Sequence, residues 1–345
     1  MTTILVTGAS GFVGSHLVPA LLGAGHRVIA LAHTPGSAET VLRRLKPDLR
    51  AGVETRLGDV TAPATLGPAF DGVEALIHLV AIPRDFDGGA SLRLVNTEGT
   101  RNVVTAARAA GVRRLVHLGA LGVADDPDLH YASSKARAEA IVATSDLDWT
   151  ILRPSLLWGE RDGFFNIVAS LVRYAPGVVP VPGRGTARFQ PLWIGDLARI
   201  VVETLANPEA TVGRSFDLGG PRCWTYREIT RAVMQAMGRP GIIVPMPVPL
   251  ISLVAGVAER VRLPFPAATD QLRQLRLDNV GPLDGVAASF GFEPVDMAGR
   301  LGYLRRRLRD QEPTIADQEP TIADHERTIA NGETTDADAE PTRPG

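Results

Sequence analysis

The chain has 345 residues, of which 45% are apolar and 21% charged, so it has enough material for a large α/β core. Its single cysteine, Cys223, excludes a framework of internal disulfides. The net charge of −2 is uneven, because residues 311–345 hold nine acidic and two basic residues. The mild basic excess elsewhere is too small and scattered to predict nucleic-acid binding, and no residue cluster predicts a metal site.

The N-terminal residues run directly into a glycine loop without the basic segment of a signal peptide, which predicts a cytoplasmic protein. No apolar run reaches the ~18 to 20 residues that a membrane span needs. The nearest candidate, 241–257, is interrupted by three prolines. The wider apolar segment 242–266 indicates a lipophilic substrate or peripheral contact with a membrane, or else forms an ordinary core of the substrate-side region.

Short β-branched runs alternate with longer helical patterns over the first 152 residues. The predicted strands span 3–6, 27–31, 52–56, 75–79, 114–118 and 149–152. Apolar strands that alternate with helices are typical of a parallel sheet that is covered on both faces. We therefore predict an α/β fold of the Rossmann type, with a doubly wound parallel sheet.

After residue 152, frequent prolines indicate irregular connections around a smaller region. A helix at 192–205 and a strand at 214–218 are expected to return to the main sheet. The predicted organisation is a Rossmann domain at 1–154 with returning pieces at about 190–218, an interleaved substrate-side region at 155–189 and 219–308, and a disordered acidic tail at 309–345. The tail repeats Gln-Glu-Pro-Thr-Ile-Ala-Asp, and one isoleucine per repeat is too little for a core.

A Thr-Gly-x-x-Gly-x-x-Gly loop follows the first strand and opens an expected helix over 12–22. Gly8 permits a sharp turn, Gly11 lets a pyrophosphate approach the backbone, and Gly14 lets the helix pack on the strand. Free N–H groups at the helix start would face the phosphates. The residues expected to bind the dinucleotide here are Gly8, Ser10, Gly11, Phe12, Val13 and Gly14.

This loop resembles the fingerprint of extended and atypical short-chain dehydrogenases/reductases, and the resemblance covers about residues 1–308. It implies further cofactor contacts after the third, fourth and sixth strands, at Asp59, Val60, Val80, Ala81 and Pro154. The end of the second strand lacks the acidic residue that would bind the ribose of NAD. His33, with Thr34 and Arg43 or Arg44, is expected to meet a 2′-phosphate, so NADP(H) is the preferred cofactor and NAD(H) the alternative. The competing interpretation makes His33 an ordinary surface residue.

Tyr131-Ala-Ser-Ser-Lys135 matches the Tyr-x-x-x-Lys motif of the same family, at the start of an expected helix. Both side chains share one helix face, so Lys135 can lower the pKa of Tyr131, which then acts as acid or base. The family's third member, a serine or threonine after the fifth strand, is missing from 114–122. Three accounts remain open: a hydroxyl from Ser133 or Ser155, chemistry by Tyr131 alone, or cofactor binding without turnover.

Four further polar residues have competing explanations. His117 is a weak substitute for the missing hydroxyl, because a strand packs its side chains against helices equally well. Asn96 matches an active-site asparagine of the family but can equally bond a neighbouring carbonyl. Arg188 meets an anionic substrate group or forms an ion pair, and Asp196 is explained as a helix N-cap.

The segments 119–122, 188–191, 218–221 and 225–228 are most similar to an atypical subgroup that includes the nucleotide-binding accessory subunit of respiratory complex I. The resemblance implies an NAD(P)(H)-binding, oxidoreductase-like protein of the epimerase/dehydratase type that acts on a carbonyl or alcohol group of an unknown small molecule. The alternative is a non-catalytic NADPH-binding subunit or redox sensor. A sugar-nucleotide epimerase comes third, because the serine or threonine is missing. The sequence does not predict the oligomeric state.

Overall fold

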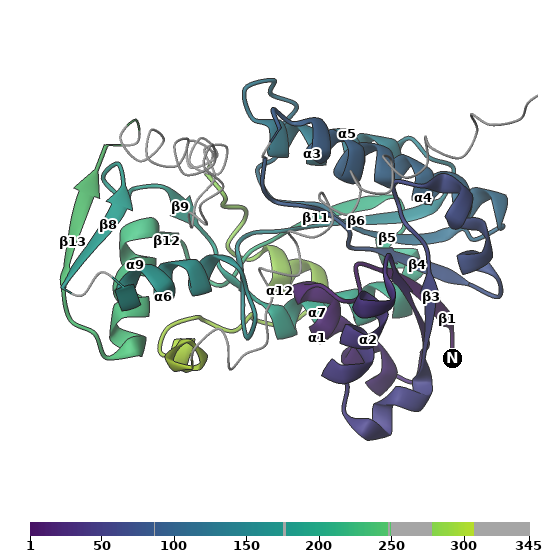
Figure 1. Cartoon of the computed structure of the whole chain (residues 1–345), viewed down its shortest axis with the longest axis horizontal. Helices are drawn as coiled ribbons and strands as arrows, with labels where there is room; N and C mark the ends of the chain where they lie inside the picture. Colours follow the sequence, from purple (N-terminus) through teal and green to yellow (C-terminus); the bar gives the residue numbers. More distant parts are fainter. Residues whose placement is uncertain (86, 175–176, 248, 250–277, 307–345) are drawn as a thin grey trace, which may run out of the picture.

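The computed structural model describes residues 1–85, 87–174, 177–247, 249 and 278–306. Its centre is a parallel seven-stranded sheet with the order β11-β6-β5-β4-β1-β2-β3 (Figure 1). The strands are β1 (Thr3–Thr7), β2 (Arg27–Ala32), β3 (Val53–Leu57), β4 (Ala75–His78), β5 (Arg114–Leu118), β6 (Asp148–Pro154) and β11 (Arg214–Leu218). The strand order reverses between β1 and β4, and ligands of such sheets bind at the carboxyl ends of the strands beside this point.

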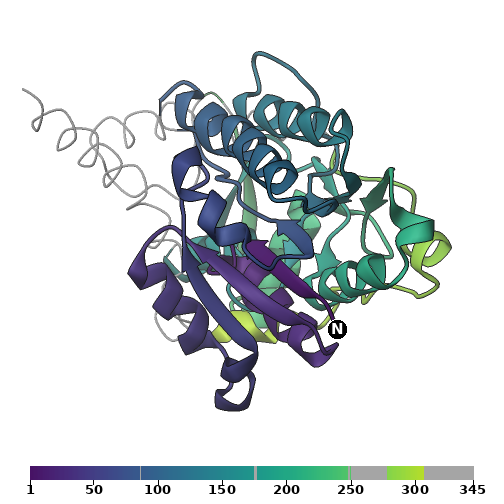
Figure 2. The same ribbon diagram turned by 90° about the vertical axis from the view of Figure 1, so that its right-hand side faces the viewer.

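Helices cover both faces of the sheet (Figure 1). One layer contains α1 (Phe12–Gly23), α2 (Pro35–Arg44) and α7 (Ile194–Ala206), and the other contains α4 (Gly99–Ala109) and α5 (His130–Ala143). Figure 2 shows the same layers from the side, with β1 starting at the marked N-terminus. Shorter elements connect them: η1 (Pro47–Gly52), η2 (Pro63–Thr65), η3 (Gly67–Phe70), α3 (Ala90–Leu92), η4 (Arg93–Glu98) and α8 (Pro208–Thr211).

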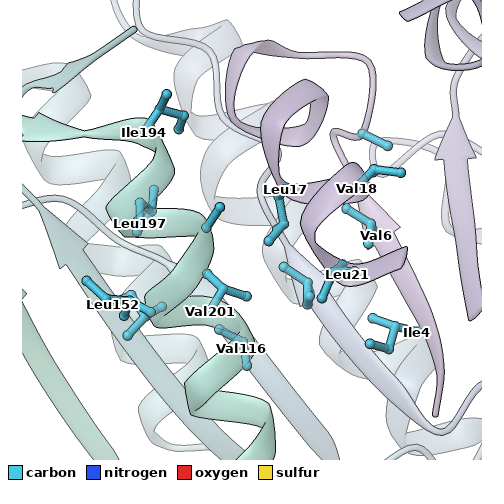
Figure 3. Close-up of a cluster of buried hydrophobic side chains, with 14 of the residues drawn as sticks. Ile4, Val6, Leu17, Val18, Leu21, Val116, Leu152, Ile194, Leu197 and Val201 are labelled. Atoms are coloured by element: carbon cyan, nitrogen blue, oxygen red, sulfur yellow. The ribbon is translucent and has the colours of Figure 1, made fainter. Parts of the chain in front are cut away.

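Alternate residues of the central strands face opposite helical layers. Ile4 and Val6 of β1 pack with Leu17 and Leu197, from α1 and α7 (Figure 3), whereas Leu5 packs in the cluster under α4 and α5. Each fully buried aliphatic side chain contributes roughly 1.5–3 kcal/mol relative to an exposed one. Because both faces of each strand are buried, these strands are apolar along their whole length, and this is the pattern that predicted them.

The remaining elements form a smaller region with its own buried cluster, on the left of Figure 1. They are β7 (Leu157–Trp158), α6 (Phe164–Tyr174), β8 (Val178–Pro182), β9 (Arg188–Phe189), β10 (Leu192–Trp193), β12 (Trp224–Thr225), α9 (Tyr226–Met237), β13 (Ile242–Met246) and η5 (Leu301–Arg305). The short helix α12 (Gly285–Phe290) instead lies against β11 and adds Val286 to the core of the main sheet.

The predicted α/β fold with a doubly wound parallel sheet is confirmed. All six predicted strands form, with ends within two residues of the prediction, and 214–218 joins the sheet as β11. The helix expected from residue 192 begins at Ile194, because Leu192 and Trp193 pair with β7. The tail 309–345 and most of the apolar segment 242–266 lie outside the described residues, and the division into domains stays a prediction. Within the described part of the chain, no helix is long and apolar enough to cross a membrane.

Candidate cofactor and active site

The glycine loop joins β1 to α1 with the geometry that its glycines require. Gly8 has a φ of +72°, a left-handed conformation that favours glycine, and the Gly11 N–H donates to Gly8 O at 3.1 Å. A Cβ on Gly14 would lie 2.5 Å from the Cα and O atoms of Ala9, so a larger residue has no room there. Gly11 has an ordinary φ of −74°, and a Cβ there would lie 3.3 Å from the Gly8 carbonyl oxygen, so the tight turn itself favours a glycine at this position.

The start of α1 has the electrostatic properties of an anion site. Its first turn contains no acidic residue, and no side chain caps its N–H groups. Phe12 and Val13 in this turn are partly exposed, as is Ser10 before it. Arg44, the last residue of α2, donates a guanidinium hydrogen bond to the Ser10 carbonyl. The structure therefore brings the predicted loop residues together at a positive helix end, with an arginine beside them.

The residues predicted at the adenosine end of the cofactor, His33, Thr34 and Asp59, have different surroundings in the structure. His33 is exposed directly after β2, and Thr34 uses its hydroxyl to accept the Ser37 N–H at 3.2 Å and cap α2. After β3, one carboxylate oxygen of Asp59 accepts the N–H and the hydroxyl of Thr61, both at 2.8 Å. Asp59 therefore fixes its own turn, and its contact with the adenine stays a prediction.

The other predicted cofactor residues lie around the carboxyl ends of the strands. A Cβ on Gly8 would lie 3.2 Å from the Val80 nitrogen, so the segment after β4 lies directly against the glycine turn. Val80 and Ala81 in this segment are partly exposed, whereas Val60 and Pro154 are buried. The backbone at Val80 and Ala81 is thus placed to line a ligand that occupies the loop.

Asn96, in the π-helix η4, uses its amide to hold the segment after β4. It accepts the Ile82 N–H at 2.8 Å and donates to Ile82 O and to Ser134 Oγ, both at 3.0 Å. This is the structural role that competed with an active-site role in the sequence analysis. Through Ser134, the same amide connects the segment after β4 to α5.

Tyr131 lies in the first turn of α5, and Lys135 lies one turn later. Lys135 is 3% exposed, and its ammonium donates to Leu118 O, at the end of β5, at 2.6 Å. Burial lowers the pKa of Lys135 to about 8, although the Glu139 carboxylate opposes this shift. Burial, and then Glu139, raise the pKa of Tyr131 to about 12. The phenol is therefore protonated at neutral pH, and the shift is opposite to the one expected from Lys135 alone.

Glu139 is a residue of this site that the sequence analysis missed. It is buried, and its carboxylate accepts the Ala120 N–H at 3.2 Å and the Arg153 Nε at 2.7 Å. Because it follows Lys135 by four residues, Tyr131, Lys135 and Glu139 form one stripe along α5. This spacing is visible in the sequence, but the contact with the backbone after β5 depends on the fold.

The carboxylate of Glu139 accounts for the missing hydroxyl after β5. A Cβ on Gly119, the first residue after this strand, would lie 2.2 Å from Glu139 Oε1 and 2.9 Å from its carboxyl carbon. A serine therefore does not fit at position 119 while Glu139 keeps its place. The buried carboxylate and the glycine are two parts of one local arrangement.

The two serines considered as replacements are engaged elsewhere. Ser133, in the first turn of α5, donates to the Asp125 carboxylate. Ser155 donates to Asn279 O at 2.8 Å and accepts the Gln190 N–H at 3.0 Å. These contacts favour the other two accounts, chemistry by Tyr131 alone or binding without turnover.

His117 is buried between the sheet and α5. Its ring stacks on His78 with 5.4 Å between centroids, and within the described part of the chain neither of its ring nitrogens has a hydrogen-bond partner. Burial, and then Lys135, hold the pKa of His117 well below its usual value, so the ring is neutral. By contrast, His78 contacts the hydroxyls of Thr7 at 2.7 Å and Thr100 at 3.0 Å. Packing against a helix is the role that these contacts support for His117.

Arg188 of the smaller region and Asp196 of α7 both have structural partners. Arg188 forms an ion pair with Asp278, with 2.6 Å between Nη2 and Oδ2. The N-cap interpretation of Asp196 is wrong, because the N-cap of α7 is Trp193 and Asp196 lies inside the first turn. There its Oδ2 accepts the Val295 N–H at 2.7 Å and fastens a distant segment to α7. The sequence placed Asp196 near a helix start but could not show this partner.

The geometry above is that of a dinucleotide-binding protein with a Tyr-Lys pair, and comparison with known proteins agrees. A family model described as NAD(P)H-binding matches residues 8–170. The chain is 30% identical over 265 residues to the 2-alkyl-3-oxoalkanoate reductase of Stenotrophomonas maltophilia, covering 69% of this chain and 77% of that protein. It therefore belongs to the NAD(P)-binding, epimerase/dehydratase-type family of extended short-chain dehydrogenases/reductases.

The chain is also similar to a subunit of a respiratory enzyme and to a solved epimerase structure. It is 25% identical over 283 residues to the NADH dehydrogenase (ubiquinone) 1 alpha subcomplex subunit 9 of Arabidopsis thaliana, covering 81% of this chain and 68% of that one. The solved structure of Thermus thermophilus UDP-glucose 4-epimerase with NAD has a TM-score of 0.66 at 22% identity, over 91% of this chain and all of that chain. The resemblance to the complex I accessory subunit is thus confirmed, and the epimerase shows the shared fold.

Proposed function

We propose that this protein is an NADP(H)-dependent oxidoreductase that acts on a carbonyl or alcohol group of a small molecule. The observation that carries the proposal is the pair of a partly exposed Tyr131 and a buried Lys135 at the same carboxyl-end edge of the sheet as the glycine loop. The glycine loop and the start of α1 fit a dinucleotide. There is no room for a side chain at Gly14, and the N–H groups in the first turn of α1 have no side-chain cap and can bind an anion.

A bound nicotinamide would supply a hydride to the carbonyl carbon of the substrate. Tyr131 would then donate its phenolic proton to the carbonyl oxygen, which gives the alcohol. A pKa of about 12 keeps this proton on the hydroxyl at neutral pH, so the phenol is in the protonated form that reduction requires. Lys135, anchored on the Leu118 carbonyl, would orient the ribose and stabilise the phenolate that remains.

The preference for the 2′-phosphate rests on charge at the adenosine end. The second strand ends without a carboxylate, His33 is exposed there, and Arg44 reaches the Ser10 carbonyl of the glycine loop. A guanidinium at this position would pair with a phosphate, whereas NAD would offer it only hydroxyls. The relative named 2-alkyl-3-oxoalkanoate reductase supports a lipophilic ketone as substrate. Cytoplasmic location and peripheral membrane association stay predictions.

A second function is favoured by the arrangement at Gly119. With Glu139 in the place of a serine side chain, the protein would bind NADPH and present a docking surface without turning the cofactor over. The similarity to an accessory subunit of complex I supports this alternative. The two functions share the cofactor site and differ only in whether Tyr131 transfers a proton.

The cofactor is tested by fluorescence titration of the purified protein with NADPH and NADH. Gly11→Asp should abolish binding of both, because it places a carboxylate where the pyrophosphate approaches. Arg44→Ala should weaken NADPH by about 10- to 100-fold, as expected for loss of a charge-assisted hydrogen bond, and change NADH much less. Arg101→Ala, an exposed arginine of α4 that pairs with Glu98, is the control. Equal losses for both cofactors in Arg44→Ala would contradict a role in 2′-phosphate recognition.

Turnover is tested next with a library of lipophilic ketones and NADPH. The enzyme function predicts reduction of at least one compound by the wild type and none by Tyr131→Phe, with unchanged NADPH affinity in the variant. Tight NADPH binding with no Tyr131-dependent reduction would support the non-catalytic subunit or sensor instead.

A further inference from the structure

The segment 159–163, between β7 and α6, reaches across from the smaller region to the helix of the glycine loop. Within it, the Arg161 guanidinium lies along the N-terminal half of α1. Its Nε and Nη2 atoms are 3.3 and 3.2 Å from Ser15 Oγ, and Nη2 is 3.4 Å from His16 Nε2. A cation from a segment about 145 residues away in sequence is therefore part of the surroundings of this helix start.

The backbone of Arg161 is unusual. Among the described residues it is the one non-glycine residue with a positive φ, at 70°. The Cβ of an L-residue clashes with the backbone in this left-handed conformation, so a glycine or an asparagine would be more stable at position 161. Residues held in such conformations occur preferentially at functional sites, where the surrounding structure enforces them.

The neighbouring carboxyl group enforces the conformation here. Asp162 is 1% exposed and accepts the N–H groups of Phe165 at 2.8 Å and Asn166 at 3.2 Å, at the start of α6. Its other oxygen accepts the Gly159 N–H at 3.3 Å and the Tyr303 hydroxyl. Because Asp162 is fixed on all sides, the strained residue before it is held with its side chain directed to α1.

The charges on this side of the loop favour an anion. The His16 Nε2–H donates to Glu160 O at 2.9 Å, and burial, opposed by this bond and assisted by Arg161, lowers the pKa of the imidazole. The Glu160 carboxylate is near enough to act against this lowering of the His16 pKa, and it pairs with Arg306 at 3.9 Å. Arg161 therefore lies beside a helix start that has no acidic residue in its first turn.

We propose that Arg161 is a cofactor-binding residue that pairs with the pyrophosphate of the dinucleotide from the side of the smaller region. The N–H groups of α1 would hold the oxygens on one side, and the planar guanidinium would hold those on the other, a geometry that suits phosphate. This inference rests on the cofactor site proposed above.

The test is Arg161→Gly, which removes the guanidinium and at the same time relieves the left-handed conformation. The variant should melt at or above the temperature of the wild type. It should bind NADPH and ADP-ribose about 10- to 100-fold more weakly, as expected for the loss of a charge-assisted contact. Affinity for adenosine, which has no phosphate, should stay within about twofold. Arg101→Ala, an exposed surface arginine paired with Glu98, is the control and should change none of these values.

The outcomes separate this inference from the cofactor proposal. Unchanged affinity of Arg161→Gly for NADPH and ADP-ribose would overturn the role of Arg161 while the cofactor site stands. An equal loss for adenosine would also overturn it, because the effect would then come from distortion of the site. Failure of the wild type to bind NADPH, NADH and ADP-ribose would overturn both proposals.

Discussion

The close contact between Gly119 and Glu139 predicts that a side chain at position 119 lowers the free energy of unfolding. Gly119→Ala adds one Cβ, which would lie 2.2 Å from Glu139 Oε1. Either the carboxylate moves and loses its bonds to the Ala120 N–H and Arg153, or the backbone after β5 shifts. Hydrogen bonds to charged groups contribute about 1.5–3 kcal/mol, and overpacking costs about 1–3 kcal/mol. We expect Gly119→Ala to lower the free energy of unfolding by about 2–3 kcal/mol.

A double-mutant cycle isolates the cause. Glu139→Ala removes the carboxylate and should itself cost about 2 kcal/mol, because it leaves the Ala120 N–H without its acceptor while Arg153 stays partly solvated. In that background Gly119→Ala meets no carboxylate, and its cost should fall to that of the remaining contact of the added Cβ with Arg153 Cγ, at 3.2 Å. The coupling energy between the two positions is then about 2–3 kcal/mol, a size expected only for residues in direct contact.

The assay is equilibrium unfolding in urea of the wild type, both single variants and the double variant. Gly23→Ala, at the end of α1, is the control, because nothing lies within 4 Å of its added Cβ. If Gly119→Ala costs the same with and without Glu139, the carboxylate is not what excludes a side chain at position 119.

Three further predictions concern the core and the loop. Gly14→Ala should lower stability by about 1–3 kcal/mol and weaken NADPH binding, while Gly23→Ala in the same helix should be neutral or slightly stabilising; similar melting temperatures for the two would contradict this. His117→Leu should raise stability by about 1–3 kcal/mol, because it removes buried ring nitrogens without partners, whereas His78→Leu should lower it; denaturation in urea compares them. Burial raises the pKa of Asp162 to about 7, so its stabilising contribution is complete below about pH 4 and is lost as the pH rises through 7. Melting curves from pH 5 to 8 should therefore show the wild type losing stability relative to Asp162→Asn as the pH rises, and a constant difference would refute this.

The sequence could predict the main sheet because its signals are local. Each central strand is apolar on both faces, and the glycine spacing marks the turn from β1 into α1. Both features depend on neighbours within a few residues. The end of a strand or helix is less certain, as at residue 192, because pairing with a distant strand decides it.

Contacts between segments that are far apart in the chain could not be predicted from the sequence. Asp196 has the residue type and position of a helix cap, yet its partner is Val295, about one hundred residues away. Arg161 lies in a loop with no motif, and only the fold places it beside α1. The spacing of Glu139 from Lys135 is visible in the sequence, but the role of Glu139 depends on its contact with Gly119. In the sequence, Gly119 indicated only that a hydroxyl residue is missing after β5.

The missing serine after β5 affects how the two proposed functions can be distinguished. A serine after β5 would donate a hydrogen bond to the substrate oxygen, but here the Glu139 carboxylate occupies its place and takes up the Ala120 N–H as well. Tyr131 then remains the proton donor of the site, and removal of one positioned donor typically slows catalysis by about 10²- to 10³-fold. A slow enzyme and a cofactor-binding subunit would therefore look alike in a binding experiment. Only turnover that disappears in Tyr131→Phe, measured over long incubations, separates them.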